Sequence, residues 1–292
     1  MPSTRDIRRR IKSVKNTAQI TKAMQMVASS KMRKAQLAAL AGRPYATLMN
    51  DVLAAVSEGA GDFTHPLMEK REGRKRALIL VSTDKGLCGA LNSNLFREAA
   101  KFGKDTTVFI CAGKKAGQFT SRMKRNLAAE FSYKDNPQFS EARAISKFAQ
   151  DMFLKGEVDG VDVLYTNFIN TLSQKPEVRP LLPIGKIQAL EADLTGESKG
   201  GELKKGDLEY LFEPSAGEVL GNLLPHYVNF QVFQFLLEAK ASEHSSRMVA
   251  MKNATDNAKQ LIKDLTLEYN KLRQANITKE LLEITTAQMA MG

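Results

Sequence analysis

The distribution of glycine and proline along the chain constrains its fold more than any other feature of the sequence. Neither residue occurs between Ser3 and Ala41, and neither occurs between Tyr227 and Met291. Both residues tend to interrupt or end helices, so these two stretches predict a long helix at each end of the chain. The segment between them contains both residues at ordinary density, which predicts a globular domain there.

Each terminal stretch carries apolar residues at alternating steps of three and four, the spacing of a coiled-coil seam. The N-terminal seam is expected to begin with Ile7, Ile11, Val14 and Ala18. After one phase slip it is expected to continue through Ile20, Met24, Val27 and Lys31. The C-terminal seam is expected to comprise Met251, Ala254, Ala258, Leu261, Leu265, Tyr269 and Leu272. A helix over residues 227–290 would be about 95 Å long and needs a partner helix in water, so the two ends predict an antiparallel coiled coil.

Short apolar runs alternate with helical patterns in the middle of the chain. Strands are expected at residues 77–83, 106–112, 127–133 and 161–169, and helices at 92–102, 114–125 and 140–154. This alternation predicts βαβ units and a mainly parallel sheet. The predicted fold is therefore α/β with long helices, divided into an N-terminal coiled-coil helix (1–58), linkers and an α/β globule (59–207), and a final segment with the long C-terminal helix (208–292).

The chain has a formal net charge of +11, and its N-terminal arm is strongly basic. Up to Lys34 the only acidic residue is Asp6. A basic helix can bind nucleic acid, lie on an anionic membrane surface, run between acidic protein walls, or simply be solvated. No aromatic residue precedes Tyr45 to stack on bases, and the apolar stripe has the spacing of a coiled-coil seam.

The loop from Ser82 to Gly89 follows an expected strand and precedes an expected helix. Functional residues gather in loops at the carboxyl ends of parallel strands. The glycines of this loop have neither the dinucleotide-binding spacing nor the Walker spacing. We therefore interpret it as a surface contact loop, with a plain structural turn as the alternative. Cys88 lacks a histidine nearby in the sequence that would favour a role as a catalytic nucleophile.

The sequence offers no recognisable catalytic or metal-binding constellation, neither paired carboxylates nor a hydrolase triad nor a metal-ligand cluster. The two cysteines, Cys88 and Cys111, form no disulfide framework, which fits a reducing compartment. No apolar run approaches the roughly 18–20 residues that span a bilayer. We expect no enzyme activity, no cofactor and no metal ion.

Six segments, spread over most of the chain, resemble the gamma subunit of F-type ATP synthases. These segments are Ile20–Lys34, Arg43–Tyr45, Thr83–Leu91, Phe168–Gln174, Ala241–Asn257 and Tyr269–Leu281. The resemblance is to the bacterial type, because the cysteine-bearing regulatory insertion of chloroplast relatives is absent. One departure is Gln288, which stands where the family has an apolar tail.

The resemblance implies a rotor shaft. Its coil would turn inside a hexamer of alpha and beta subunits, and its Rossmann-like globule would sit on the c-ring with the epsilon subunit. Flow of protons or sodium ions would turn this shaft, which would open and close the catalytic sites in sequence. The chain would be non-catalytic, present once per complex, and peripheral on the cytoplasmic face of the bacterial inner membrane. The alternative is a basic coiled-coil protein that binds nucleic acid or acts as a scaffold.

The resemblance also implies which residues touch the other subunits. Those expected to contact beta subunits are Met24, Asp84, Lys85, Cys88, Arg273, Gln274 and Thr278. The segment Leu208–Pro214 is expected to form the foot on the c-ring, with Tyr210 and Glu213 as the contact residues.

Overall fold

The computed structural model describes residues 3–42, 44–49, 52–53, 65–71, 73–184, 213 and 215–291, and the structural statements below concern these residues. The chain divides into two compact units. The coil unit joins Met1–Ala28 with Met248–Gly292, and the globular unit is Ser29–Arg247. Each unit is described by itself.

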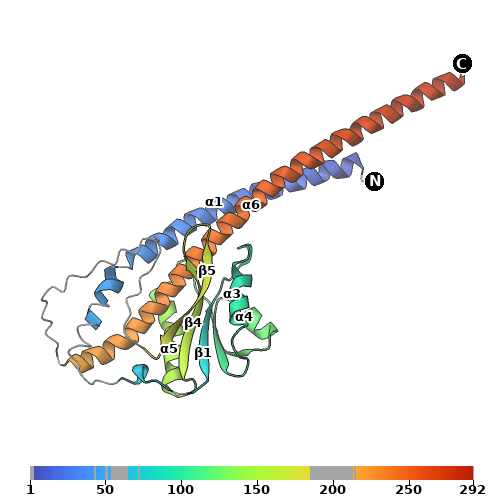
Figure 1. The fold of residues 1–292 in the computed structure, drawn as a ribbon. Helices are drawn as coiled ribbons and strands as arrows, with labels where there is room; N and C mark the ends of the chain where they lie inside the picture. The colour runs from blue at the N-terminus through green and yellow to red at the C-terminus, as the bar shows by residue number, and fades with distance from the viewer. Residues whose placement is uncertain are drawn as a thin grey trace. The chain divides into compact units, whose positions relative to one another are not determined.

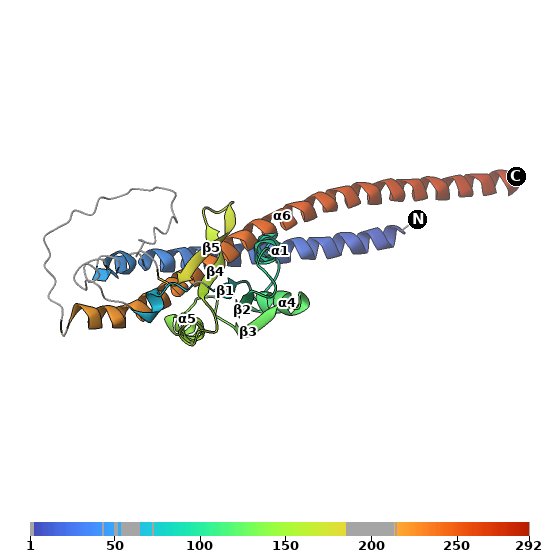
Figure 2. The same cartoon turned by 60° about the horizontal axis from the view of Figure 1, so that its bottom comes forward.

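Two helices form the coil unit, the first part of α1 (Thr4–Ala41) and the last part of α6 (Ala216–Met291). They lie side by side in both views and run in opposite directions, with the two chain termini at the same end (Figures 1 and 2). One buried polar pair joins them, because the hydroxyl oxygens of Thr21 and Thr255 lie 2.7 Å apart. The predicted antiparallel pairing of the two chain ends is confirmed.

The seam of the coil unit differs from the prediction in its details. On α1 its buried or half-buried positions include Ile7, Ile11, Val14, Ala18, Thr21, Met24, Gln25 and Ala28. On α6 they include Met251, Ala254, Thr255, Ala258, Ile262, Leu265, Tyr269 and Leu272. Two positions of the predicted phase slip are wrong, since Ile20 and Val27 are 61% and 56% exposed, whereas Met24 and Lys31 are half-buried. On α6 the predicted seam residue Leu261 is 46% exposed. The spacing continues without interruption because the two threonine hydroxyls satisfy each other, which allows polar residues to occupy the seam.

A five-stranded sheet forms the centre of the globular unit. Its strands are β1 (Arg76–Val81), β2 (Thr107–Ala112), β3 (Asn126–Phe131), β4 (Gly160–Phe168) and β5 (Gln174–Leu182), in the order β3-β2-β1-β4-β5. The first four are parallel, and β5 runs antiparallel to β4. The sequence predicted the four parallel strands but missed β5, which carries Pro176 and Pro180 and lies at the sheet edge, where proline is tolerated.

Helices cover both faces of this sheet. Alternate residues of β1 point to opposite sides, so that Leu78 packs in the core beneath α3 (Leu91–Ala99) and α4 (Lys114–Arg122), and Ile79 packs beneath α5 (Phe139–Leu154). The first part of α6 packs on the same side as α5 (Figure 1). A short 3-10 turn, η1 (Pro66–Met68), adds Leu67 to that core. Because β1 to β4 are parallel, their carboxyl ends lie at one edge of the sheet, where Ser242 of α6 donates to the carbonyl of Thr166 on β4.

α1 ends close to where glycine and proline predict, whereas α6 begins well before its predicted start. α1 ends at Ala41, and residues 44–49 are helical again beyond Gly42. α6 begins at Ala216, earlier than expected, and includes Pro225 because Leu220 and Leu224 are buried in the core. Residues 193–207, at the end of the region predicted to hold linkers and the globule (59–207), lie outside the described residues. A search of the described helices for a long, apolar, bilayer-crossing stretch finds none.

Candidate functional site

The contact loop, Ser82–Gly89, begins where β1 ends and is anchored at its start. Ser82 accepts a hydrogen bond from the backbone N–H of Ala116 (2.7 Å) and donates one to the carbonyl of Gly113 (3.3 Å). Gly113 has a φ of +102°, and a Cβ atom there would lie 2.3 Å from the carbonyl oxygen of Ser82. Only glycine fits this close approach, so the end of β2 and the start of the loop are packed against each other.

Asp84 and Lys85 lie at the front of the contact loop. The carboxylate of Asp84 accepts a hydrogen bond from the backbone N–H of Lys114 (2.9 Å) and so caps the first turn of α4. Lys85 is exposed. Two residues further on, Leu87 is 62% exposed and has a φ of +63°. The loop therefore exposes a cation, Lys85, and an apolar side chain, Leu87, while hydrogen bonds to the start of α4 hold its first residues.

Cys88 points into the protein. Its side chain is buried, the amide of Asn92 donates to its sulfur at 3.4 Å, and Ser246 on α6 donates to its carbonyl at 2.7 Å. Burial raises the pKa of the thiol and so keeps it protonated. A partner that contacts the loop at this position would meet the backbone rather than the sulfur.

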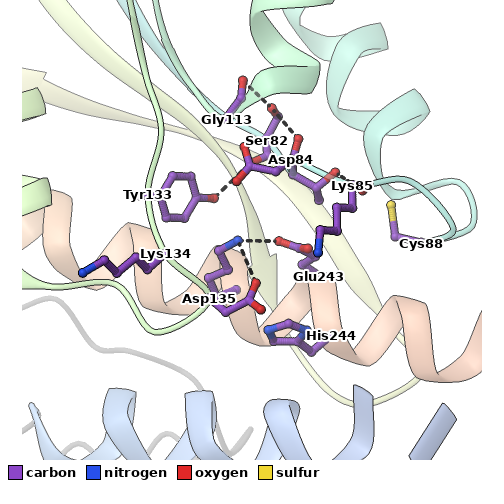
Figure 3. Close-up of polar contacts among 12 residues, drawn as sticks. Ser82, Asp84, Lys85, Cys88, Gly113, Tyr133, Lys134, Asp135, Glu243 and His244 are labelled. Carbon is purple, nitrogen blue, oxygen red and sulfur yellow. Dashed lines mark hydrogen bonds and ion pairs between the residues drawn. The ribbon is translucent and has the colours of Figure 1, made fainter. Parts of the chain in front are cut away.

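A charged cluster lies beside the contact loop, and two of its members, Asp135 and Glu243, are labelled in Figure 3. It consists of Lys31, Asp135, Lys240, Glu243 and Arg247. Glu243 is the centre of its α6 portion, because one carboxylate oxygen lies 3.0 Å from the ammonium nitrogen of Lys240 and the other lies 2.9 Å from Arg247. The Lys240 and Glu243 side chains are only 1% and 4% exposed. Opposite charges at this spacing let ionised groups stay inside a protein.

Asp135, in the segment between β3 and α5, extends the cluster to α1. Its carboxylate pairs with Lys31 of α1 and lies 3.8 Å from the ammonium nitrogen of Lys240. The hydrogen bond from Lys31 lowers the pKa of Asp135. Beside it, the Lys240 ammonium lies 4.5 Å from the centre of the Tyr133 ring. Burial raises the pKa of Tyr133 well above its ordinary value, so the phenol stays neutral.

His244 lies against the same cluster (Figure 3). It is 2% exposed, and its Nε2 atom has no hydrogen-bond partner. Its pKa is lowered to about 4, mainly because burial disfavours the charged imidazole. His244 is therefore neutral at physiological pH and adds no charge to the cluster.

The other predicted contact residues are spread over both long helices. Met24 is half-buried on α1. Arg273, Gln274 and Thr278 are exposed on α6, beyond the last seam residue, Leu272. The Thr278 hydroxyl donates to the carbonyl of Gln274 (2.9 Å), as expected for residues four apart on one helix face. Of the predicted foot residues, Glu213 is exposed and Tyr210 lies outside the described residues.

The sequence interpretation missed the charged cluster. Two signals for it were present, a lysine at the end of the apolar run from Tyr227 to Ala241 and the helical spacing of Lys240, Glu243 and Arg247. Neither signal identifies Asp135, which is distant in sequence. Among the residues described, no group of three or more His, Cys, Asp or Glu side chains is placed to hold a metal ion.

Comparison with known proteins shows similarity over the whole chain. A family model described as ATP synthase matches residues 3–291. The ATP synthase gamma chain of Methylacidiphilum infernorum (isolate V4) is 48% identical over 297 residues, which cover 100% of both chains. The ATP synthase gamma chain of Opitutus terrae is 49% identical over 292 residues, which cover 99% of each.

Solved structures show the same fold at lower identity. A chain of the Euglena gracilis mitochondrial ATP synthase, from an assembly of OSCP, F1 and c-ring, matches with a TM-score of 0.68 and 21% identity. That match covers 99% of this chain and 94% of the other. A chain of the Tetrahymena thermophila central stalk and c-ring matches with a TM-score of 0.59 and 24% identity, over 80% of this chain and 99% of the other.

Proposed function

The chain belongs to the ATP synthase gamma chain family, and on that premise we propose that it is the central rotor shaft of an F-type ATP synthase. The observation that carries this proposal is the full-length match to gamma chains at 48–49% identity. The fold agrees with it, since a long two-helix coil is combined with a globule built on a parallel sheet. A full-length match of this kind favours the rotor over a nucleic-acid-binding or scaffolding protein.

The work of the shaft is mechanical. Ion flow turns the c-ring, the globule turns with it, and the asymmetric coil opens and closes the catalytic sites of the alpha and beta subunits in sequence. The chain itself is non-catalytic, is present once per complex beside the epsilon subunit, and lies at the cytoplasmic face of the bacterial inner membrane. Tyr210 and Glu213 are proposed to meet the c-ring.

Two sets of polar residues are proposed to hold the beta subunits at each step. Arg273, Gln274 and Thr278, with Met24, would face one beta subunit. The contact loop would face another through Asp84, Lys85 and the backbone at Cys88. Hydrogen bonds to such groups contribute roughly 0.5–3 kcal/mol each, which is enough to bias which catalytic site is open and small enough to break at every step.

The test is steady-state ATP hydrolysis by the assembled catalytic head. Replacing Arg273→Ala and Gln274→Ala together should lower turnover several-fold, because both hydrogen-bonding side chains are lost while the exposed helix keeps its backbone. The subunit content of the gel-filtered complex is measured in parallel and should not change. Glu268→Ala, at an exposed position of the same helix, is the matched control. Unchanged turnover in the double variant would make these residues ordinary solvated positions.

A further inference from the structure

Lys240 is the most deeply buried charged group in the described part of the chain. It lies on α6 within the globular unit, and its side chain is 1% exposed. A buried ammonium group is strongly unfavourable unless opposite charge and hydrogen bonds replace the water that it loses. Glu243 at 3.0 Å, Asp135 at 3.8 Å and the Tyr133 ring at 4.5 Å supply that replacement. The buried ammonium of Lys240 is thus surrounded by groups that compensate its charge.

Two chains of contacts lead from Lys240 to the backbone of the contact loop. The first passes through Tyr133, whose hydroxyl donates to the carbonyl of Ser82 at 2.9 Å. The second passes through Glu243 to Arg247, whose guanidinium donates at 3.3 Å to the carbonyls of two neighbouring loop residues, Lys85 and Gly86. Both chains therefore end on the loop backbone, on either side of Asp84.

We propose that Lys240 is a positioning residue for the contact loop. Its ammonium holds the Glu243 carboxylate and the Tyr133 ring in place, and these two groups hold the loop. Through Asp135, the same ammonium is linked to Lys31, so α1 is connected to the loop as well. The positioning takes place within this chain and does not depend on the rotor function. Only its consequence, that the loop is held ready for a partner subunit, rests on the proposed function.

Lys240→Met removes the charge and keeps an unbranched side chain of similar size. Asp135 then has Lys31 as its remaining described partner, and Glu243 has Arg247. Glu243 is expected to turn both carboxylate oxygens toward the Arg247 guanidinium and draw it away from the loop carbonyls. Tyr133 loses the cation against its ring. Removing one partner of a buried pair is strongly destabilising when the other charge is left uncompensated. Here Lys31 and Arg247 still compensate Asp135 and Glu243, so the variant should assemble with a looser loop.

The chain contains a reporter for this change and an internal reference. Cys88 lies in the contact loop and is 2% exposed, and its carbonyl is held by Ser246. Cys111 lies on β2, an interior strand of the sheet, and is 0% exposed. A loosened loop exposes the thiol of Cys88 alone, whereas general unfolding exposes both thiols.

The experiment measures the labelling rate of each thiol in the full chain with a thiol reagent and peptide mass mapping. In Lys240→Met the labelling of Cys88 should be about tenfold faster than in the unmodified chain, the change that about 1.4 kcal/mol produces. Labelling of Cys111 should be unchanged. The ratio of the Cys88 labelling rate in Lys240→Met to that in the unmodified chain should be the same at two pH values. A looser loop raises this ratio equally at both, whereas a shifted thiol pKa would change it with pH. Lys252→Met, at an exposed lysine of the same helix, is the matched control and should label like the unmodified chain.

Two results would overturn the proposal. One is a Cys88 labelling rate in Lys240→Met equal to that of the control variant. The other is a parallel rise for Cys88 and Cys111, which would mean that Lys240 only stabilises the fold. ATP hydrolysis by the assembled head is a separate measurement on the same variant. Faster Cys88 labelling with unchanged hydrolysis would support the positioning role of Lys240 and refute the proposed contact of the loop with a beta subunit.

Discussion

α6 is one continuous helix with two different surroundings. From Tyr227 to Ser245 every residue is buried except Gln231 and Phe233, which are half-buried. From Arg273 to Met289 every residue is exposed. Between these parts, a single seam that ends at Leu272 is covered by α1 (Figures 1 and 2).

The parts of this one helix are therefore stabilised differently. The buried part is held by the core of the globular unit, and its polar groups need internal partners, as when Gln150 donates to Asn229 at 3.1 Å. Among the described residues, none supports the exposed part in this way, although Ile277, Leu281 and Ile284 are apolar and 47–58% exposed. Apolar side chains at successive helical turns without a covering element indicate a partner surface.

The largest expected effect lies in the buried part of α6. Leu236→Ala should lower the free energy of unfolding of the globular unit by about 3 kcal/mol, because it leaves a cavity at a fully buried position. Urea denaturation, followed by near-ultraviolet circular dichroism of the buried tyrosines, measures the loss. The matched control is Leu267→Ala on the same helix, where the side chain is 70% exposed and the change should stay within about 0.5 kcal/mol. Equal losses in both variants would contradict the difference between the two parts.

A second effect of intermediate size concerns pH. The folded pKa of His244 is about 4 and its ordinary value is 6.5, so the unfolded chain binds more protons between these pH values. The stability that this group contributes is complete above pH 6.5 and is lost as the pH falls toward 4. We expect a loss of about 2 kcal/mol over this range.

Urea denaturation at a series of pH values tests this expectation. His244→Gln should flatten the dependence between pH 6.5 and 4, whereas His226→Gln, which also removes one imidazole from α6, should retain it. A slope that persists in His244→Gln would assign the pH dependence to another group.

Local patterns along the chain predicted much of this fold. The glycine- and proline-free arms predicted the two long helices, and alternating apolar runs predicted four strands and three helices of the globule. Errors arose where a distant contact overrides a local pattern. Val27 and Leu261 look like seam residues by sequence, but the Thr21–Thr255 pair fixes the seam on other positions.

The candidate site was predictable only in part, because some of its contacts join residues that are distant in sequence. The contact loop is continuous in sequence and follows a strand, so its position could be recognised. The charged cluster combines α1, α6 and the segment after β3, and only folding brings Lys31, Asp135 and Lys240 together. The local signals, a lysine at the end of an apolar run and charges spaced along one helix face, concern α6 alone and do not identify its partners on the other two segments.

The smallest expected effect lies at the exposed end of α6. Replacing Leu281→Ala and Leu282→Ala together should change the thermal stability of the isolated chain by less than about 0.5 kcal/mol, because both side chains are already 57–60% exposed. Alanine also has the highest helix propensity, so the helix itself is not weakened. Leu265→Ala, at a half-buried seam position of the coil unit, is the contrasting variant and should cost about 1–2 kcal/mol. Far-ultraviolet circular dichroism during heating compares the three proteins. A double variant that melts like Leu265→Ala would show that this end of α6 is packed within the chain itself, and the case for a partner at these leucines would fail.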